Sequence, residues 1–501
     1  MGARRLAPFA ALLLGLLAPG EEARAGGFVL YEFGAGATGM CGAQTAGADD
    51  PAVLFFNPAA ITRLERTRLA LGVSLIKPVS DYAANGDEVK TWSGIKYADG
   101  TTGDVIVSDG THSVDQEPAL FTPPHLYATH RFGKAVSFGF GLFTPYGLGV
   151  NWPRTWDGRY IIKQVNLETF TFNPVLAVDL AQLLAGQEDP FLHFSVAVGY
   201  MGNYSRALLD KNTDWRGLAK QMNSFEPYPV NEADLDGIVR MEGTGWANSF
   251  NAAVHLEIPK LISAGFQYRH HFELKYDGTA EMEMPDWFTQ PTMGGAGPAK
   301  GAATSMIWPK ETDGTTTMYM PTLYNMGVAL LVIPNLVIEA DLFLEDYTSY
   351  EELKLEWGCN DESPPCNIPE DPTPKDWTWN YQAVIGAAYT LQNDLTLRLG
   401  FGRVGSPVPE ETYDPVLPDG ERTLVTLGAG MPFLGMFRWD LGYMFAYWQG
   451  EKTGATKLVD GKEVPVNDAG APSNTNVLNG RAIGKYTTMS HILALTIGAE
   501  F

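Results

Sequence analysis

The feature that most constrains this chain is an alternation of apolar and polar residues that recurs along most of its length. Between Phe437 and Trp448, one set of alternate residues is apolar and largely aromatic, and the other set is mostly polar or small. Residues 395–402 and 493–501 repeat the pattern. A period of two indicates β-strands with one apolar face, because successive side chains of a strand point to opposite sides of the sheet. We therefore predict an all-β protein.

The number of strands and the lengths of their connections distinguish between the possible all-β folds. A β-sandwich also alternates, with its apolar face turned inward, but it has no reason to alternate short and long connections strictly. That alternation, with an even number of strands, is typical of an outer-membrane barrel with short periplasmic turns and long extracellular loops. The fourteen predicted strands span about 67–77, 124–132, 135–147, 161–181, 191–208, 238–257, 261–281, 315–332, 336–357, 378–390, 394–404, 422–431, 436–448 and 486–501.

Composition supports this fold and excludes both a nucleic-acid partner and a helical membrane protein. Charged residues are 19% of the 501, Gly accounts for 54 residues, and mean hydropathy is −0.10, as expected when one strand face is apolar and the other polar. A net charge of −23 excludes nucleic acid as a partner, since phosphate binding needs a basic surface. Beyond the N-terminal segment there is no apolar run of 18 or more residues, which excludes a helical membrane protein.

The N-terminal segment has the features of a secretory signal peptide. Arg4 and Arg5 precede an apolar run of about 13 residues, and a cleavage signal ends at Ala25. We expect three parts: a signal peptide over 1–25, a Gly- and Ala-rich hatch over 26–65 that plugs the lumen, and the transmembrane barrel over 66–501. The compartment is oxidising, so Cys359 and Cys366 are expected to form a small loop disulfide.

No catalytic, metal or cofactor site emerges from the motifs. Gly34–Gly39 reads G-x-G-x-x-G, but no βαβ pattern follows it, so we attribute these glycines to tight packing of the hatch. His270 and His271 are neighbours, and on a regular strand they point to opposite faces and cannot share a metal ion. Asn57, Pro58 and Ala59 end the hatch, where the Asn57 amide can satisfy backbone groups of a strand.

Several stretches, in order over almost the whole mature chain, resemble the long-chain fatty acid transporter (FadL-type) family of outer-membrane proteins, which also includes importers of aromatic hydrocarbons. The stretches are the Gly34–Leu64 segment with FFNPAAITRL, WDGRYI at Trp156–Ile161, FNPVLAVDL at Phe172–Leu180, DYTSYEELK at Asp346–Lys354, TLRLGFGRVGSPVP at Thr396–Pro409 and LPDGER at Leu417–Arg422.

The resemblance implies a 14-stranded barrel closed by a hatch, with lateral release of the solute where the third strand is kinked. It places gating at Asn57, Pro58 and Ala59 and in the third strand, where Gly139 and Gly141 weaken ladder pairing. It implies Lys354 as the cation for a carboxylate headgroup. Arg159 is a second candidate, for which a structural ion pair is the alternative.

The expected function is passive transport of long-chain fatty acids or related hydrophobic compounds across the outer membrane by a monomer. Its partners are the solute, the lipid bilayer and lipopolysaccharide, which divalent cations could bridge to acidic loops. The alternatives are an aromatic-hydrocarbon importer of the same fold, a barrel lipase or protease, and a surface adhesin or phage receptor.

Overall fold

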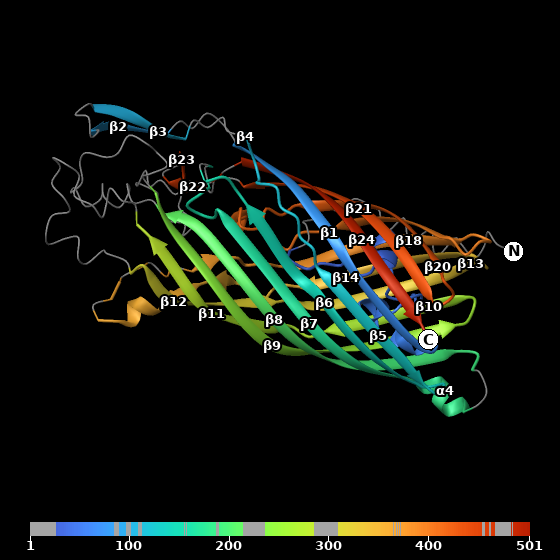
Figure 1. Ribbon diagram of the computed structural model, residues 1–501. Helices are drawn as coiled ribbons and strands as arrows, with labels where there is room; N and C mark the ends of the chain where they lie inside the picture. The colour runs from blue at the N-terminus through green and yellow to red at the C-terminus, as the bar shows by residue number, and fades with distance from the viewer. Residues whose placement is uncertain are drawn as a thin grey trace.

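The structure, a computed structural model, is a single closed barrel with its lumen filled by the N-terminal segment (Figure 1). It describes residues 27–84, 90–96, 102–108, 113–186 without 155 and 157, 190–213, 236–284, 309–452 without 364, 367, 369 and 371, 456–459, 462–465, 482 and 484–501. The predicted signal peptide, residues 1–25, lies outside the described residues. No described helix is long and apolar enough to cross a membrane.

The barrel has fourteen antiparallel strands, as predicted. Each strand pairs with its neighbours in sequence, and β1 pairs with both β5 and β24, which closes the sheet. The strands are β1 (Thr67–Ala84), β5 (Pro124–Phe132), β6 (Val136–Asn151), β7 (Gln164–Asp179), β8 (His193–Thr213), β9 (Gly237–Ile258), β10 (Ile262–Arg269) continued by β11 (Phe272–Glu283), β12 (Glu311–Met320) continued by β13 (Thr322–Ile333), β14 (Leu336–Asp346), β18 (Trp379–Thr390), β19 (Thr396–Val404), β20 (Glu421–Phe433), β21 (Phe437–Lys452) and β24 (Gly484–Glu500).

The apolar strand faces point outward, toward lipid. Leu399 of β19 and Leu427 of β20 are exposed at paired positions, as is Leu495 of β24, and the alternate residues face the lumen. At the end of the barrel with the short turns, the other connections between strands have two to five residues. The connection from β7 to β8, residues 180–192, is longer and includes helix α4 (Leu180–Ala185).

Two adjacent strands are interrupted part-way along their length. Pro321 separates β12 from β13, since proline cannot donate to the ladder. His270 and His271 separate β10 from β11, and their ring centroids lie 4.2 Å apart. The expectation that these rings point to opposite faces is therefore wrong, because the strand is irregular here. Among the described residues no group of three or more His, Cys, Asp or Glu side chains is arranged to hold a metal ion.

The long loops carry minor elements outside the barrel sheet or on its rim. The predicted Cys359–Cys366 disulfide is present, with a Cα–Cα distance of 5.5 Å. The elements are β2 (Lys90–Lys96), β3 (Thr102–Ser108), β4 (Ser113–Asp115), β15 (Glu352–Leu353), β16 (Leu355–Trp357), η4 (Gly358–Asp361), β17 (Thr373–Pro374), η5 (Glu410–Thr412), β22 (Thr456–Val459) and β23 (Lys462–Pro465).

The N-terminal segment packs inside the barrel as three short helices: α2 (Ala35–Gly39), α3 (Val53–Phe56) and η1 (Pro58–Arg63). Almost every residue of the three helices is buried. Helices this short are marginal in isolation, so contacts with the wall must hold them. We call residues 27–65 the hatch.

Glycines of the wall make room for the hatch backbone. A Cβ atom added to Gly265 would lie 2.0 Å from the Thr45 carbonyl oxygen, and one added to Gly442 would lie 2.4 Å from that of Ala35. Close approaches of the same kind occur at four further lumen-facing glycines. These are Gly327 against Thr45, Gly386 and Gly400 against Met40, and Gly428 against Gly39. The last contact agrees with the packing role predicted for Gly39.

Two carboxylates of β14 bind the hatch backbone directly. Asp341 Oδ2 accepts hydrogen bonds from the N–H groups of Gln44 and Thr45 at 2.9 and 2.8 Å. Glu339 Oε1 accepts from Ala46 and Gly47 at 2.7 and 3.0 Å. Both acidic side chains are buried. Four backbone N–H groups of the hatch thus donate to two buried side chains of one strand, so this acidic pair is a major attachment of the hatch.

Replacing both carboxylates (Glu339→Gln with Asp341→Asn) is expected to loosen the hatch while the barrel stays folded. Weakening the four hydrogen bonds that these two side chains accept costs about 2–4 kcal/mol. The open hatch should therefore be populated at least tenfold more often. Single-molecule conductance in planar bilayers measures this as a rise in opening events. Glu421→Gln, on the outer face, is the control, and a closed baseline in the double variant would contradict the role.

Candidate functional site

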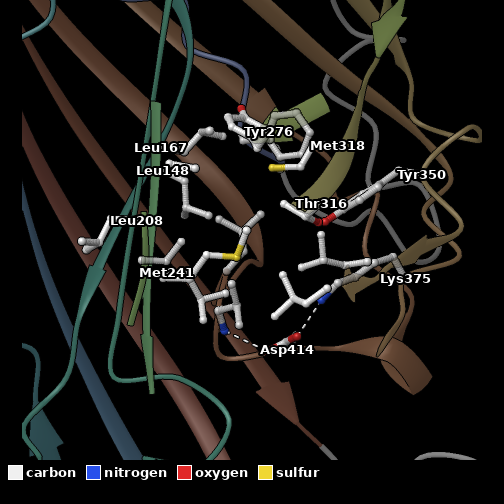
Figure 2. Close-up of a pocket in the computed structure, with 18 of the residues that line it drawn as sticks. Leu148, Leu167, Leu208, Met241, Tyr276, Thr316, Met318, Tyr350, Lys375 and Asp414 are labelled. Atoms are coloured by element: carbon white, nitrogen blue, oxygen red, sulfur yellow. Dashed lines mark hydrogen bonds and ion pairs between the residues drawn. The ribbon is translucent and has the colours of Figure 1, made fainter. Parts of the chain in front are cut away.

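An apolar cavity lies above the hatch, between the wall and inward-folded loop segments (Figure 2). It holds about 830 Å³ of unfilled space, partly open to solvent. We call it the upper cavity. Its lining is Phe28, Leu148, Val165, Leu167, Ala207, Leu208, Leu209, Met241, Gly243, Tyr276, Thr316, Met318, Tyr350, Leu353, Leu355, Lys375, Trp377, Val408, Asp414, Val416 and Leu417.

The upper cavity has one charged edge. Lys375 Nζ donates to Asp414 Oδ2 at 2.6 Å, and these are the only charged side chains in the described lining. Figure 2 shows this pair at one edge, with Leu148, Leu167 and Met241 on the opposite side. Lys375 is only 4% exposed. Burying an ammonium group is costly unless it is paired, which is why the lysine and the aspartate occur together.

Asp414 interacts with more than one positive charge. Burial alone would raise the pKa of Asp414, but the positive charges of Lys375 and Lys452 more than offset it and hold the pKa below its usual value. Lys211 also interacts electrostatically with Asp414. Asp414 thus interacts electrostatically with three lysines, of which Lys375 lines the cavity.

Aromatic rings join the floor of the upper cavity to the hatch. The ring of Phe28 lies 5.3 Å from Tyr347, 6.1 Å from Tyr350 and 5.5 Å from Trp377, measured between centroids. The Trp377 indole N–H has no hydrogen-bond partner among the described residues. Anything that fills the cavity therefore contacts Phe28, the second described residue of the hatch.

The chain segment that carries Phe28 pairs with a break in β6. Leu30 N donates to Pro145 O at 2.9 Å, and Gly147 N donates to Phe28 O at 3.0 Å. On the other side, the register of β6 against β7 shifts between Phe143 and Tyr146. Pro145 has no N–H for the ladder, so the hatch segment completes the pairing that the wall lacks here.

A second cavity begins at this break, and we call it the wall cavity. It shares Leu148, Leu167 and Leu417 with the upper cavity and holds about 1650 Å³, including space open to solvent. Its lining contains lumen residues such as Glu345 and also Arg206, which is exposed on the outer face. The wall cavity therefore reaches both faces of the barrel wall.

Phe121 covers Gly149 in the wall cavity. A Cβ atom on Gly149 would lie 1.8 Å from Cζ of the Phe121 ring. Phe121 is held from the other side by paired backbone hydrogen bonds to Ile76 at 2.8 and 2.9 Å. The part of β6 that carries Gly149 has no ladder to β5, which pairs only with residues 136–142. A side chain rather than a continuous ladder thus fills this part of the wall.

The two predicted cations lie outside the upper cavity lining. Lys354 is solvent-exposed between the lining residues Leu353 and Leu355, and its Nζ lies 2.8 Å from Glu356 Oε1. The hydrogen bond and charge of Glu356 raise the pKa of Lys354. Arg159 is buried, and its Nε donates to Asp236 Oδ2 at 2.8 Å. This is the structural ion pair that the sequence left as the alternative.

The predicted hatch and gating residues lie at the wall. Asn57 Nδ2 donates to Thr45 O at 2.8 Å and to Val254 O of β9 at 3.1 Å, and its Oδ1 accepts from Ala59 N. Pro58 follows as the first residue of η1. The described contacts of this motif thus tie the end of the hatch to a strand backbone.

Gly139 and Gly141 lie in regular ladders with both neighbouring strands. A Cβ atom on Gly139 would lie 2.5 Å from Leu54 of the hatch. The register shift comes after both glycines, around Pro145. Their role in gating stays a prediction.

Lys375 was not found from the sequence. It follows Pro374 in a loop without periodicity, and only the folding of that loop onto the barrel brings it to the cavity. Trp377, two residues further on, lines the same cavity, but a single aromatic residue in a loop does not by itself mark a buried lysine.

The sequence and fold match known outer-membrane transport proteins. Residues 17–501 match the family described as "Outer membrane protein transport protein (OMPP1/FadL/TodX)". The long-chain fatty acid transport protein of Salmonella typhi is 21% identical over 90% of this chain and 94% of that protein. That of Escherichia coli K12 is 21% identical over 90% and 94%.

Two solved structures share the fold. A Pseudomonas aeruginosa FadL homologue has a TM-score of 0.72 and 17% identity, covering 95% of this chain and 100% of that one. The Pseudomonas putida toluene transporter TodX has a TM-score of 0.59 and 14% identity, covering 95% and 99%. The chain therefore belongs to the OMPP1/FadL/TodX family: it is a non-enzymatic outer-membrane β-barrel protein that transports hydrophobic compounds.

Proposed function

We propose that this protein carries long-chain fatty acids, or closely related amphiphiles, passively across the outer membrane. The observation that carries the proposal is the form of the upper cavity: apolar side chains with a single charged edge at Lys375. Apolar surface buried there is stabilised by about 25 cal/mol per Å². A carboxylate headgroup has a cation within reach at the edge. The relatives named as fatty acid transport proteins are in accord with this substrate.

The release route runs sideways through the wall cavity. Solute in the upper cavity displaces Phe28, and the loss of the bridge between Val29 and Tyr146 frees the break in β6. Phe121 then moves off Gly149, and the solute enters the bilayer. Sideways release keeps the apolar chain out of water, so no energy source beyond binding and downstream consumption is required.

An aromatic hydrocarbon is the second candidate substrate. Lys375 is already paired with Asp414, and the rest of the described lining is nearly all apolar or aromatic. A neutral solute would leave that ion pair undisturbed. The similarity in fold to a toluene transporter is in accord with this class. The two candidates differ in whether a ligand carboxylate contributes to binding.

The remaining proposals concern partners and the other cations. The protein acts as a monomer, with the bilayer and lipopolysaccharide around the barrel. Lys354 and Arg159 are the headgroup cations that the family resemblance implies. Because Lys354 is exposed and close in sequence to the cavity lining, it is also the natural comparison for Lys375.

Oleate uptake tests the proposed function directly. Expressing the protein in a Gram-negative host that lacks its own transporter is expected to restore uptake of radiolabelled oleate. A folded protein in the outer membrane with no uptake of oleate would contradict the fatty-acid proposal. Uptake of toluene alone would favour the second candidate.

Lys375→Met is expected to weaken oleate binding by about 10–100-fold, the value of one or two hydrogen bonds to a charged group. Binding of methyl oleate should change less than about threefold, since the ester carries no charge. Isothermal calorimetry on the purified protein measures both ligands.

Two further variants complete the comparison. Lys354→Met is the control and should leave both ligands unaffected if Lys375 holds the headgroup. Lys375→Met combined with Asp414→Asn removes the unpaired buried charge and guards against misfolding. Equal losses for acid and ester in both lysine 375 variants would reject the headgroup role.

Gly149→Val tests the release route. The added carbons overlap the Phe121 ring and fill the wall cavity, so oleate uptake should fall by roughly tenfold, in line with the cost of overpacking. Oleate binding in the upper cavity should stay within about twofold. Gly498→Ala, where the nearest atom lies 3.6 Å from the added Cβ, is the control. Unchanged uptake in Gly149→Val would argue against this route.

A further inference from the structure

Helix α4 presents an unusually apolar surface at the periplasmic end of the barrel. Leu184 is 89% exposed and Phe191, in the same connection, is 79% exposed; Leu183 and Leu192 are exposed as well. The helix sequence Leu180–Ala185 carries no charge. Isolated exposed apolar residues are ordinary, but a group of four on one connection marks a contact surface.

The position of the helix is fixed by buried polar contacts. Asp179 caps α4 by accepting from Gln182 N at 3.0 Å, and its second carboxylate oxygen lies 2.6 Å from His193 Nδ1. Gln182 is buried and donates to Gly186 O. With the polar side of α4 held against the barrel in this way, the two leucines that follow Gln182 are left on the exposed side.

The same carboxylate lies next to the end of the hatch. Arg63 Nη1 is 4.0 Å from Asp179 Oδ2, and Thr62 Oγ1 lies 2.7 Å from Ser195 Oγ of β8. Asp179, which caps α4, is thus also close to the last helix of the hatch. Figure 1 shows α4 projecting from the barrel at the end that holds the C-terminus.

The apolar surface of α4 continues the belt of exposed apolar side chains on the outer, lipid-facing side of the barrel strands. Leu176 of β7 and Phe194 of β8 are exposed on the outer face of the two strands that α4 connects. Leu192 lies two residues before Phe194, on the side of α4, and in an extended chain it points to the same face of the sheet as Phe194. This continuity with the belt identifies the occupant as lipid rather than a soluble protein.

We propose that α4 is an interfacial anchor whose leucines, together with Phe191, insert into the periplasmic leaflet of the outer membrane. The ligand class is the glycerol and upper acyl region of phospholipids. Amphipathic helices bind this region by burying their apolar face to about 5–10 Å. The anchor fixes the depth of β7 and β8 in the membrane and, through Asp179, keeps the hatch end aligned with it.

Site-directed spin labelling tests the proposal on the full-length protein in phospholipid vesicles. Leu184→Cys and Phe191→Cys each introduce one accessible thiol, because Cys359 and Cys366 are bonded and Cys41 is buried. Power saturation measures label accessibility to oxygen, which concentrates in lipid, and to a water-soluble nickel complex. Unsubstituted protein gives the labelling background.

Two reference positions calibrate the result. Leu397→Cys lies on the lipid-facing side of β19, and Asn393→Cys lies in an exposed periplasmic turn. Labels at 184 and 191 are expected to match Leu397→Cys, with oxygen accessibility several-fold above that of the nickel complex. Values matching Asn393→Cys at both positions would overturn the proposal and leave a soluble periplasmic partner as the occupant to seek. Gel-shift on heating confirms that each variant is folded.

Discussion

The close seating of the hatch on the barrel wall is the interaction on which the rest of the structure depends. A barrel of this size encloses a wide lumen, and the hatch fills it with its backbone and with buried side chains such as Phe33, Phe55 and Phe56. Wall glycines such as Gly265 and Gly442 admit that backbone, and Glu339 and Asp341 bind its N–H groups. With the axis blocked there, the exit that we propose for a solute in the upper cavity is the wall cavity beside the break in β6.

The sequence predicts the fold well because the membrane imposes a simple pattern. Lipid on one side and lumen on the other force a period of two on every strand, as in 395–402 and 437–448. Strand number, closure and the disulfide at Cys359 follow from such local signals. Asn57 was identified as a group that satisfies strand backbone, and it does bind the Val254 carbonyl.

The candidate site is less predictable, because its charged residues lie in loops that have no regular sequence pattern. Lys375 reaches the cavity only through the fold of its loop, and its pairing with Asp414 spans 39 residues. The family motif indicated Lys354, which the loop turns toward Glu356 and solvent. The prediction that His270 and His271 point to opposite faces is wrong, because the strand is irregular there and the period of two does not hold. Long-range contacts of this kind leave no trace in periodicity.

A reversible cross-link between the hatch and β6 tests the central claim, that the segment carrying Phe28 must leave the wall for solute to pass. Val29 and Tyr146 face each other across the bridge, and such non-hydrogen-bonded pairs have Cα atoms close enough for a disulfide. In Val29→Cys with Tyr146→Cys, oleate uptake should be lost when the pair is oxidised and return on reduction. Equal uptake in the two redox states would contradict the account.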